Sequence, residues 1–151
     1  MEYDSQITYL IHFFHIFNLT IMPFDAKINF DGSPERRVLH ASYSVSQSAD
    51  YVTGKTTSEV YAGNVTLEVE SINKSKFWEY AIHPTKRFKG EIIFKSDEDE
   101  EKTFKTVSFE DAAVVGYSES LDARSSGTTT ENITLSVKKL TIDDVPFEKK
   151  W

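Results

Sequence analysis

Apolar and polar residues alternate along most of the chain after residue 23, which is the pattern of β-strands that bury one face. The alternation is clear over residues 24–30, 36–47 and 63–72, and it predicts a strand over each segment. The apolar side chains that share the buried sides of these strands are expected to be Phe24, Ala26, Ile28, Phe30, Leu39, Ala41, Tyr43, Val45, Val65, Leu67 and Val69.

The second half of the chain continues in the same way. Residues 89–96 and 102–110 flank an acidic run at residues 97–101, which has the composition of a solvated hairpin tip and lacks the spacing of a calcium loop. Residues 111–123 and 130–142 predict a further hairpin. The chain is therefore expected to hold about seven strands.

One segment, NKSKFWEYAIHP at residues 73–84, has the helical period instead, with apolar residues four apart. Asn73 or Ser75 can cap its start, because their side-chain oxygens accept from the free amides of the first turn. Pro84 ends it. The predicted fold class is mostly β: an antiparallel β-barrel of two packed sheets with one short α-helix.

Two predicted strands carry apolar residues at successive positions, residues 92–94 and 112–115, and are therefore apolar on both faces. A barrel wall buries only one face, so the other face needs a cover. The helix can shield part of it, and a neighbouring subunit is the other cover. The alternation of residues does not decide between the helix and a neighbouring subunit as the cover.

The connection between the second and third strands is the polar segment SQSADYVTGKTTSEVYAG, residues 46–63. A tight hairpin needs only about two to five linking residues. A longer unstructured connection in a compact domain usually has a function. We therefore expect a functional loop here, with a flexible solvent-exposed loop as the alternative.

The N-terminal segment ITYLIHFFHIFNLTI, residues 7–21, is nearly all apolar but shorter than the roughly 20 residues that span a bilayer. It follows an acidic start and precedes no small-residue cleavage site, so it does not resemble a secretory signal. The favoured hypothesis is a natural start at Met22, with residues 1–22 as an apolar extension and 23–151 as the domain. A short anchor, or a strand that pairs elsewhere, is the alternative, and no stable membrane insertion is expected.

The composition argues against several classes of function. The formal net charge of −7 argues against a general nucleic-acid binder, and the absence of cysteine excludes disulfides, thiol catalysis and cysteine-ligated metal. Outside the N-terminal extension the histidines are His40 and His83, and neither has a companion at metal-ligand spacing. No nucleophile elbow, phosphate-binding loop or zinc-protease motif occurs. We therefore predict no catalytic residue, no cofactor and no metal, and a protein that is not an enzyme.

Three stretches resemble a known family. FDAKINFDG with VLHASYSVSQSADYVTGKTTSEVYAGNVTLEVES, the helix KFWEYAI, and KGEIIFK with FKTVSFEDAAVVGYSESLDARSSGTTTENITLSVKKLTI occur in the order found in the type VI secretion tube proteins. These are the hemolysin-coregulated proteins (Hcp, TssD), and the chain looks most like their short branch. No single motif is specific enough to identify the family. The resemblance rests on the order of the motifs over residues 24–151.

The resemblance implies rings of six protomers that stack head to tail into a tube. A contractile sheath would propel the tube, with sheath, baseplate and tip proteins as partners and effector proteins in the lumen. The protein would be cytoplasmic before firing and then secreted. In this family the long loop reaches the next ring, and the helix packs between subunits. The implied ring-stacking residues are Ala49, Asp50, Tyr51, Val52, Thr53, Lys55, Glu59, Val60 and Tyr61, and the implied subunit-packing residues are Phe77, Trp78 and Ile82.

Two other functions remain open from the residues. A small ligand-binding β-barrel would be a monomer with a pocket in its mouth. A tail-tube protein of a phage or of another contractile injection particle would share the architecture of the secretion tube. The oligomeric mass distinguishes a monomeric ligand-binding barrel from a secretion tube subunit. The neighbouring genes distinguish a phage-type tube protein from a secretion tube subunit.

Overall fold

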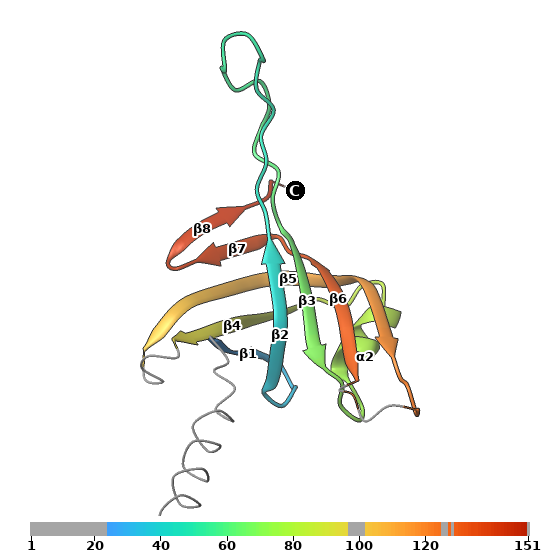
Figure 1. Ribbon diagram of the computed structural model, residues 1–151. Coiled ribbons are helices and arrows are strands. Elements are labelled where there is room, and N and C mark those ends of the chain that lie inside the picture. The colour runs from blue at the N-terminus through green and yellow to red at the C-terminus, as the bar shows by residue number, and fades with distance from the viewer. Residues whose placement is uncertain (1–23, 97–101, 125–126, 128, 151) are drawn as a thin grey trace, which may run out of the picture.

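The computed structural model describes residues 24–96, 102–124, 127 and 129–150, and this part of the chain holds eight strands and one helix (Figure 1). The predicted extension at residues 1–22 and the acidic run at residues 97–101 lie outside it. In chain order the elements are β1 (Phe24–Phe30), β2 (Arg36–Tyr43), β3 (Asn64–Glu70), α2 (Lys76–Ile82), β4 (Phe88–Ser96), β5 (Thr103–Ser120), β6 (Thr130–Ser136), β7 (Lys139–Ile142) and β8 (Val145–Glu148).

The strands close into an antiparallel barrel. They follow the order β4-β1-β2-β3-β6-β5, and β4 also pairs with β5, so the row closes on itself. Two short strands, β7 and β8, extend the sheet outward from β5. The predicted fold class, an antiparallel barrel with one short helix, is confirmed.

A single strand, β5, belongs to both sheets of the barrel. Its first part pairs with β4 and β7, and its second part, from Ala113 to Ser120, pairs with β6. Between the two parts Asp111 has a φ of 51°, and the register against β4 shifts by one residue. Such a bulge bends the strand without ending it. The prediction of separate strands over residues 102–110 and 111–123 is therefore wrong, because a bend was interpreted as a boundary.

Aromatic rings fill much of the interior. The Phe30 and Phe77 rings stack with centroids 4.5 Å apart, and Phe88 meets Phe109 edge-on at 5.7 Å. Such offset and edge-on arrangements are the favoured ones for aromatic pairs. The interior is completed by buried aliphatic residues from every barrel strand: Ala26, Ile28, Val38, Val65, Leu67, Val69, Ile92, Val107, Ala112, Ile133 and Leu135.

The predicted buried side of β2 is wrong at its start, and Val45, which was predicted to be buried, lies beyond the end of β2 and is 64% exposed. Val38 pairs with Val69 and His40 pairs with Glu68, so β2 has one extra residue, Leu39, at this point. The extra residue reverses the alternation. Val38 is therefore buried, whereas Leu39 is 38% exposed. The alternation predicted for β3, with Val65, Leu67 and Val69 inward, is confirmed.

The helix covers part of the second apolar face of β5. The rings of Trp78 in α2 and Tyr117 in β5 lie 5.6 Å apart between centroids. On the same strand Ala112 is buried, whereas Val115 remains 62% exposed. The helix is thus one of the two predicted covers, and an apolar remainder stays open on this strand.

We predict that Gly90→Ala lowers the free energy of unfolding by about 1–3 kcal/mol. A methyl group there would lie 2.6 Å from the Asn29 carbonyl oxygen and 2.8 Å from Cζ of Phe109, so the closing strands would have to move apart. Urea denaturation measures the change. Gly116→Ala is the matched control, because its methyl group would meet only Thr134, at 3.3 Å, and should cost less. Equal losses for the two variants would contradict the close approach at Gly90.

Candidate functional site

The connection between β2 and β3, residues 44–63, forms an arm that projects from one end of the barrel (Figure 1). Its two sides are joined by backbone hydrogen bonds. The Ser46 amide donates to the Tyr61 carbonyl at 2.8 Å and the Tyr61 amide returns a bond at 2.7 Å. Further out, the Thr57 amide donates to the Ser48 carbonyl at 2.8 Å. The arm is therefore an ordered, narrow hairpin.

The tip of the arm is organised by one carboxylate, that of Asp50. Its Oδ1 accepts from the Val52 amide at 3.0 Å, the Thr53 amide at 2.8 Å and the Thr53 hydroxyl at 3.0 Å. These donors, with those of Thr53 strongest, hold the pKa of Asp50 below its ordinary value. Gly54 supplies the positive φ of 71° that closes the turn.

Large apolar side chains are exposed along this polar arm. Tyr51 at the tip is 97% exposed and Val52 is 74% exposed. Nearer the barrel, Val60 and Tyr61 are also exposed. Aromatic residues set among polar ones are typical of protein interfaces. The predicted stacking residues thus fall in two places, Ala49, Asp50, Tyr51, Val52, Thr53 and Lys55 at the tip, and Glu59, Val60 and Tyr61 nearer the barrel.

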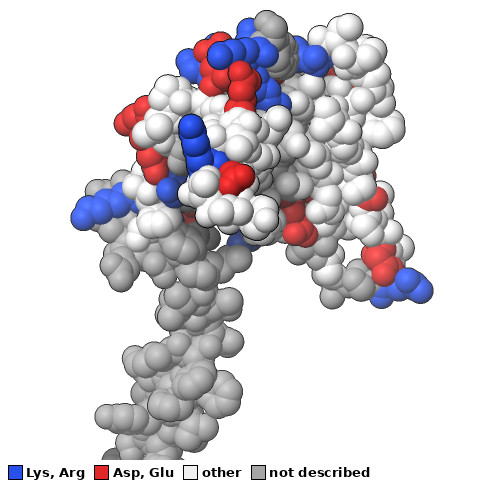
Figure 2. All heavy atoms as spheres, turned by 90° about the horizontal axis from the view of Figure 1, so that it is seen from above, with Lys and Arg blue, Asp and Glu red and all other residues white. Residues whose placement is uncertain are grey.

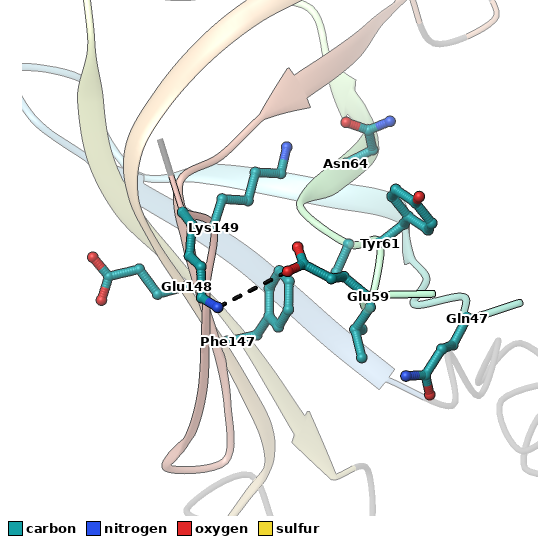
Figure 3. A pocket seen from close by; sticks show the side chains of 10 residues that line it. Gln47, Glu59, Tyr61, Asn64, Phe147, Glu148 and Lys149 are labelled. Carbon is teal, nitrogen blue, oxygen red and sulfur yellow. Dashed lines mark ion pairs between the residues drawn. The ribbon is translucent and has the colours of Figure 1, made fainter. Parts of the chain in front are cut away.

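A groove of about 670 Å³ lies between the root of the arm and β8 (Figure 3). Its walls include Val60 and Tyr61 from the arm and Phe147 from β8. Lys150 forms a 4.0 Å ion pair with Glu59 across it. The sequence analysis missed this contact, because nothing in a local pattern shows that the end of the chain returns to the arm.

The arm is also held at its root by a close backbone contact. Gly63 has a φ of +96°, and a methyl group there would lie 2.5 Å from Cε of Lys149 and 2.6 Å from the Val137 carbonyl oxygen. The Val137 amide donates to the Gly63 carbonyl at 2.7 Å. Only glycine fits this conformation and this space. The chain therefore enters β3 at a fixed place beside its own C-terminal segment.

The helix is anchored by a buried ion pair that the sequence analysis did not predict. Arg36 donates to Oε2 of Glu131 at 3.0 Å, and both side chains are fully or almost fully buried. Ser75, at the N-cap position of α2, accepts from Arg36 at 3.0 Å and donates to Glu131 at 2.7 Å. The predicted capping by the Ser75 side chain is therefore wrong, because this hydroxyl serves the ion pair instead of a helix amide.

The alternation of residues along β6 contains a signal for the buried position of Glu131. Glu131 is in phase with the buried residues Ile133 and Leu135 of β6, so strict alternation places it inward. The charge of Glu131 also acts on the phenol group of Tyr117 in β5. Burial, together with the negative charges of Glu131 and Glu119, raises the pKa of Tyr117 to about 12.

The helix presents two of its three predicted subunit-packing residues to solvent. Trp78 is 54% exposed and Ile82 is 56% exposed. Phe77 is fully buried against Phe30 and is approached by the guanidinium of Arg36, 5.3 Å from the ring centroid. The assignment of Phe77 to subunit packing is therefore corrected: this ring belongs to the core of its own protomer.

Among the described residues, no group of three or more His, Cys, Asp and Glu side chains could hold a metal ion. No helix in the described segments is long and apolar enough to cross a membrane. Acidic and basic side chains lie intermixed on the face seen in Figure 2. The arm and the helix both expose large apolar side chains.

Comparison with known proteins gives the family. The sequence matches the hemolysin-coregulated protein family, Hcp or TssD, over residues 19–151. The chain belongs to this family. Hcp proteins are the structural tube proteins of type VI secretion, and the chain is a tube subunit of this kind. The family is secreted by the type VI system, and the resemblance found in the sequence is confirmed.

Solved structures agree with this assignment. Hcp1 from Flavobacterium johnsoniae is 26% identical, with a TM-score of 0.74 over 83% of this chain and 99% of that chain. Hcp1 from Salmonella typhimurium is 16% identical, with a TM-score of 0.65 over 80% and 86% of the two chains. A chain in the baseplate of the anti-feeding prophage is 18% identical, with a TM-score of 0.50 over 81% and 93%. No match was found among the curated proteins.

We predict that Asp50→Ala speeds hydrogen exchange of the Val52 and Thr53 amides, measured by NMR, because both lose their acceptor. Since the pKa of Asp50 is lowered in the folded chain, its effect is present above the ordinary carboxyl pKa of about 3.9 and is lost as the pH falls through the lowered value. Asp122→Ala, which removes a carboxylate from another exposed turn, should leave these amides unchanged. Unchanged exchange in Asp50→Ala would contradict the assigned role.

We predict that Glu131→Gln lowers the free energy of unfolding by about 3–5 kcal/mol, because it leaves the charge of Arg36 buried without its partner. Thermal or urea unfolding measures the loss. Glu70→Gln is the matched control: it removes the partner of Arg37 in a pair whose side chains are more than a third exposed, and should cost at most about 1 kcal/mol. A loss at Glu131 no larger than that at Glu70 would contradict the cost assigned to an unpaired buried charge at Arg36.

Proposed function

We propose that copies of this chain form rings of six that stack head to tail into the inner tube of a type VI secretion apparatus. The arm is the main support for this proposal. It is ordered by its own hydrogen bonds before any partner binds, and its tip exposes Tyr51 and Val52. An ordered arm loses little conformational freedom on binding, which favours association.

The position of the arm at one end of the barrel suits a contact between copies that repeats along an axis. Figure 1 places the arm at one end of the barrel and the β1–β2 and β3–α2 connections at the other. A contact between two different ends of identical copies is heterologous and propagates along an axis. Each arm contact can be weak, because every ring supplies several of them together and multivalency multiplies their effect.

The work of such a protein is mechanical. A contractile sheath drives the tube, baseplate and tip proteins receive it, and effector proteins travel in its lumen. The protein is cytoplasmic before firing and is then exported, and it catalyses no reaction. The barrel interior is already filled by side chains such as Phe30, Phe88 and Phe109, which favours a structural unit over a ligand-binding barrel.

A second candidate function is a tube subunit of another contractile injection particle. The likeness to a chain of the anti-feeding prophage baseplate favours it. Both functions require rings and stacking, so the two differ only in the surrounding machinery. Co-purification of the native tube separates them, since it brings down type VI sheath and baseplate proteins in the first case only.

Light scattering after size-exclusion chromatography tests the proposal, with electron microscopy of concentrated protein. A mass of six protomers and stacked rings are expected. A single-protomer mass at every concentration, with no tubes, would reject the tube function for this chain.

We predict that the double variant Tyr51→Asp with Val52→Asp keeps the mass of its rings but forms no tubes in negative stain. Two charges at the tip would have to be desolvated without partners on stacking. Tyr51→Phe with Val52→Ile is the matched control, since it keeps an apolar tip and should still stack. Long tubes from the charged variant would show that the arm tip is not the axial contact.

A further inference from the structure

The strand β8 forms an edge of the sheet. The strand order ends with β8, which pairs with β7 on one side and, within the described segments, with no strand on the other. In Figure 1, β8 lies on the side of β7 toward the arm, so this edge faces the end of the barrel from which the arm projects. An open edge offers backbone N–H and C=O groups to which a strand of another chain can add.

The backbone groups on this edge can be assigned to residues. The Lys149 amide donates to the Lys138 carbonyl at 2.8 Å, so the backbone of Lys149 faces β7. In an antiparallel pair, residues that exchange hydrogen bonds with the partner strand alternate with residues whose N–H and C=O point the other way. Because the register against β7 is regular, Phe147 also faces β7. The residues on either side of it, Pro146 and Glu148, therefore face the open edge.

The proline removes one of the two donors on this edge. Proline has no N–H, so of the two outward-facing residues only Glu148 can donate a hydrogen bond to an added strand. The pairing of β8 with β7 is not weakened, because Pro146 lies opposite Thr141 at a position where an N–H would point away from β7. The proline therefore weakens contacts with another chain and leaves the hairpin of β7 and β8 intact.

A second copy of β8 is the strand that this edge would otherwise fit. Two β8 edges that meet antiparallel, with Phe147 of the two copies opposite each other, would place residue 146 of each copy opposite Glu148 of the other. With an N–H at residue 146, each of these pairs could exchange both of its hydrogen bonds. The same register would bring Lys150 of one copy opposite Asp144 of the other, and opposite charges at facing positions stabilise a strand pair. Charge and register therefore permit this contact, and the missing amide opposes it.

We infer that Pro146 prevents the β8 edges of two copies from pairing. The contact that it blocks is isologous, since it uses the same surface on both copies and closes after two of them. It would join two molecules at the ends from which their arms project. The inference applies to a single chain and does not require rings. Its consequence for the tube rests on the proposed function: a blocked β8 edge leaves the arm end free for the opposite end of the next ring, which favours head-to-tail stacking.

The variant Pro146→Thr tests the inference in the full-length chain, because it restores the outward amide with a residue that is favoured in strands. At matched concentration, light scattering should give about twice the wild-type mass, since the isologous contact closes after two copies. Hydrogen exchange of the β8 peptide, followed by mass spectrometry, should slow at Glu148 by about tenfold, which corresponds to one net hydrogen bond. Pro146→Val restores the same amide with another side chain and should behave alike.

Two matched controls separate the outward amide from other effects of the substitution. Val145→Thr introduces the same residue at a position whose backbone already faces β7, and it should keep the wild-type mass. The double variant Pro146→Thr with Glu148→Pro moves the proline to the other outward-facing position. It should return the mass to the wild-type value, because one donor of the edge is again missing.

Wild-type mass and wild-type exchange at every concentration for both Pro146→Thr and Pro146→Val would overturn the inference. A doubled mass for Val145→Thr or for the double variant would also overturn it, because association would then not depend on the outward amide of residue 146. A wild-type chain that stays a single protomer at every concentration rejects the proposed function. In that case, a dimer of Pro146→Thr with slowed exchange at Glu148 would still support the inference.

Discussion

The pairing of one long strand with three others is the constraint on which the rest of the structure depends. β5 closes the barrel against β4, carries β7 and β8 outward, and then continues as the margin of the other sheet beside β6. The bend at Asp111 allows a single strand to do this without a break in the chain. The strand thereby supplies a wall to both sheets, and the helix packs against its second part through Trp78 and Tyr117.

The position of the helix follows from a charge that is buried with its partner. Arg36 comes from β2, Glu131 from β6 and Ser75 from the start of α2, so one small polar cluster joins two strands to the helix. Burying an ion pair contributes little net stability, but it penalises every arrangement that separates the partners. The cluster therefore ties the start of α2 to β2 and β6, while Phe77 of the helix is buried in the protomer and Trp78 and Ile82 remain exposed.

The arm is the surface proposed for stacking in the tube. The arm is stiffened by its own hydrogen bonds and fixed at its root beside the C-terminal segment, so it is directed away from the barrel. An arm that is already ordered before it meets a neighbouring ring loses little conformational freedom on stacking, which favours association in the proposed tube.

The sequence alone was sufficient for the class of fold, for the buried side of β3, for the existence of the arm and for the family. These features depend on local alternation, on turn residues and on motif order, all of which are visible in the order of the residues. It was insufficient at Leu39 and Asp111, where one extra residue changes the phase or the direction of a strand. It was also insufficient for Arg36 with Glu131 and for the contact of Lys149 with Gly63. These depend on which strands meet, and residues far apart in the chain come together only when the barrel closes; tertiary structure alone decides which charges are paired and which apolar side chains are left outside.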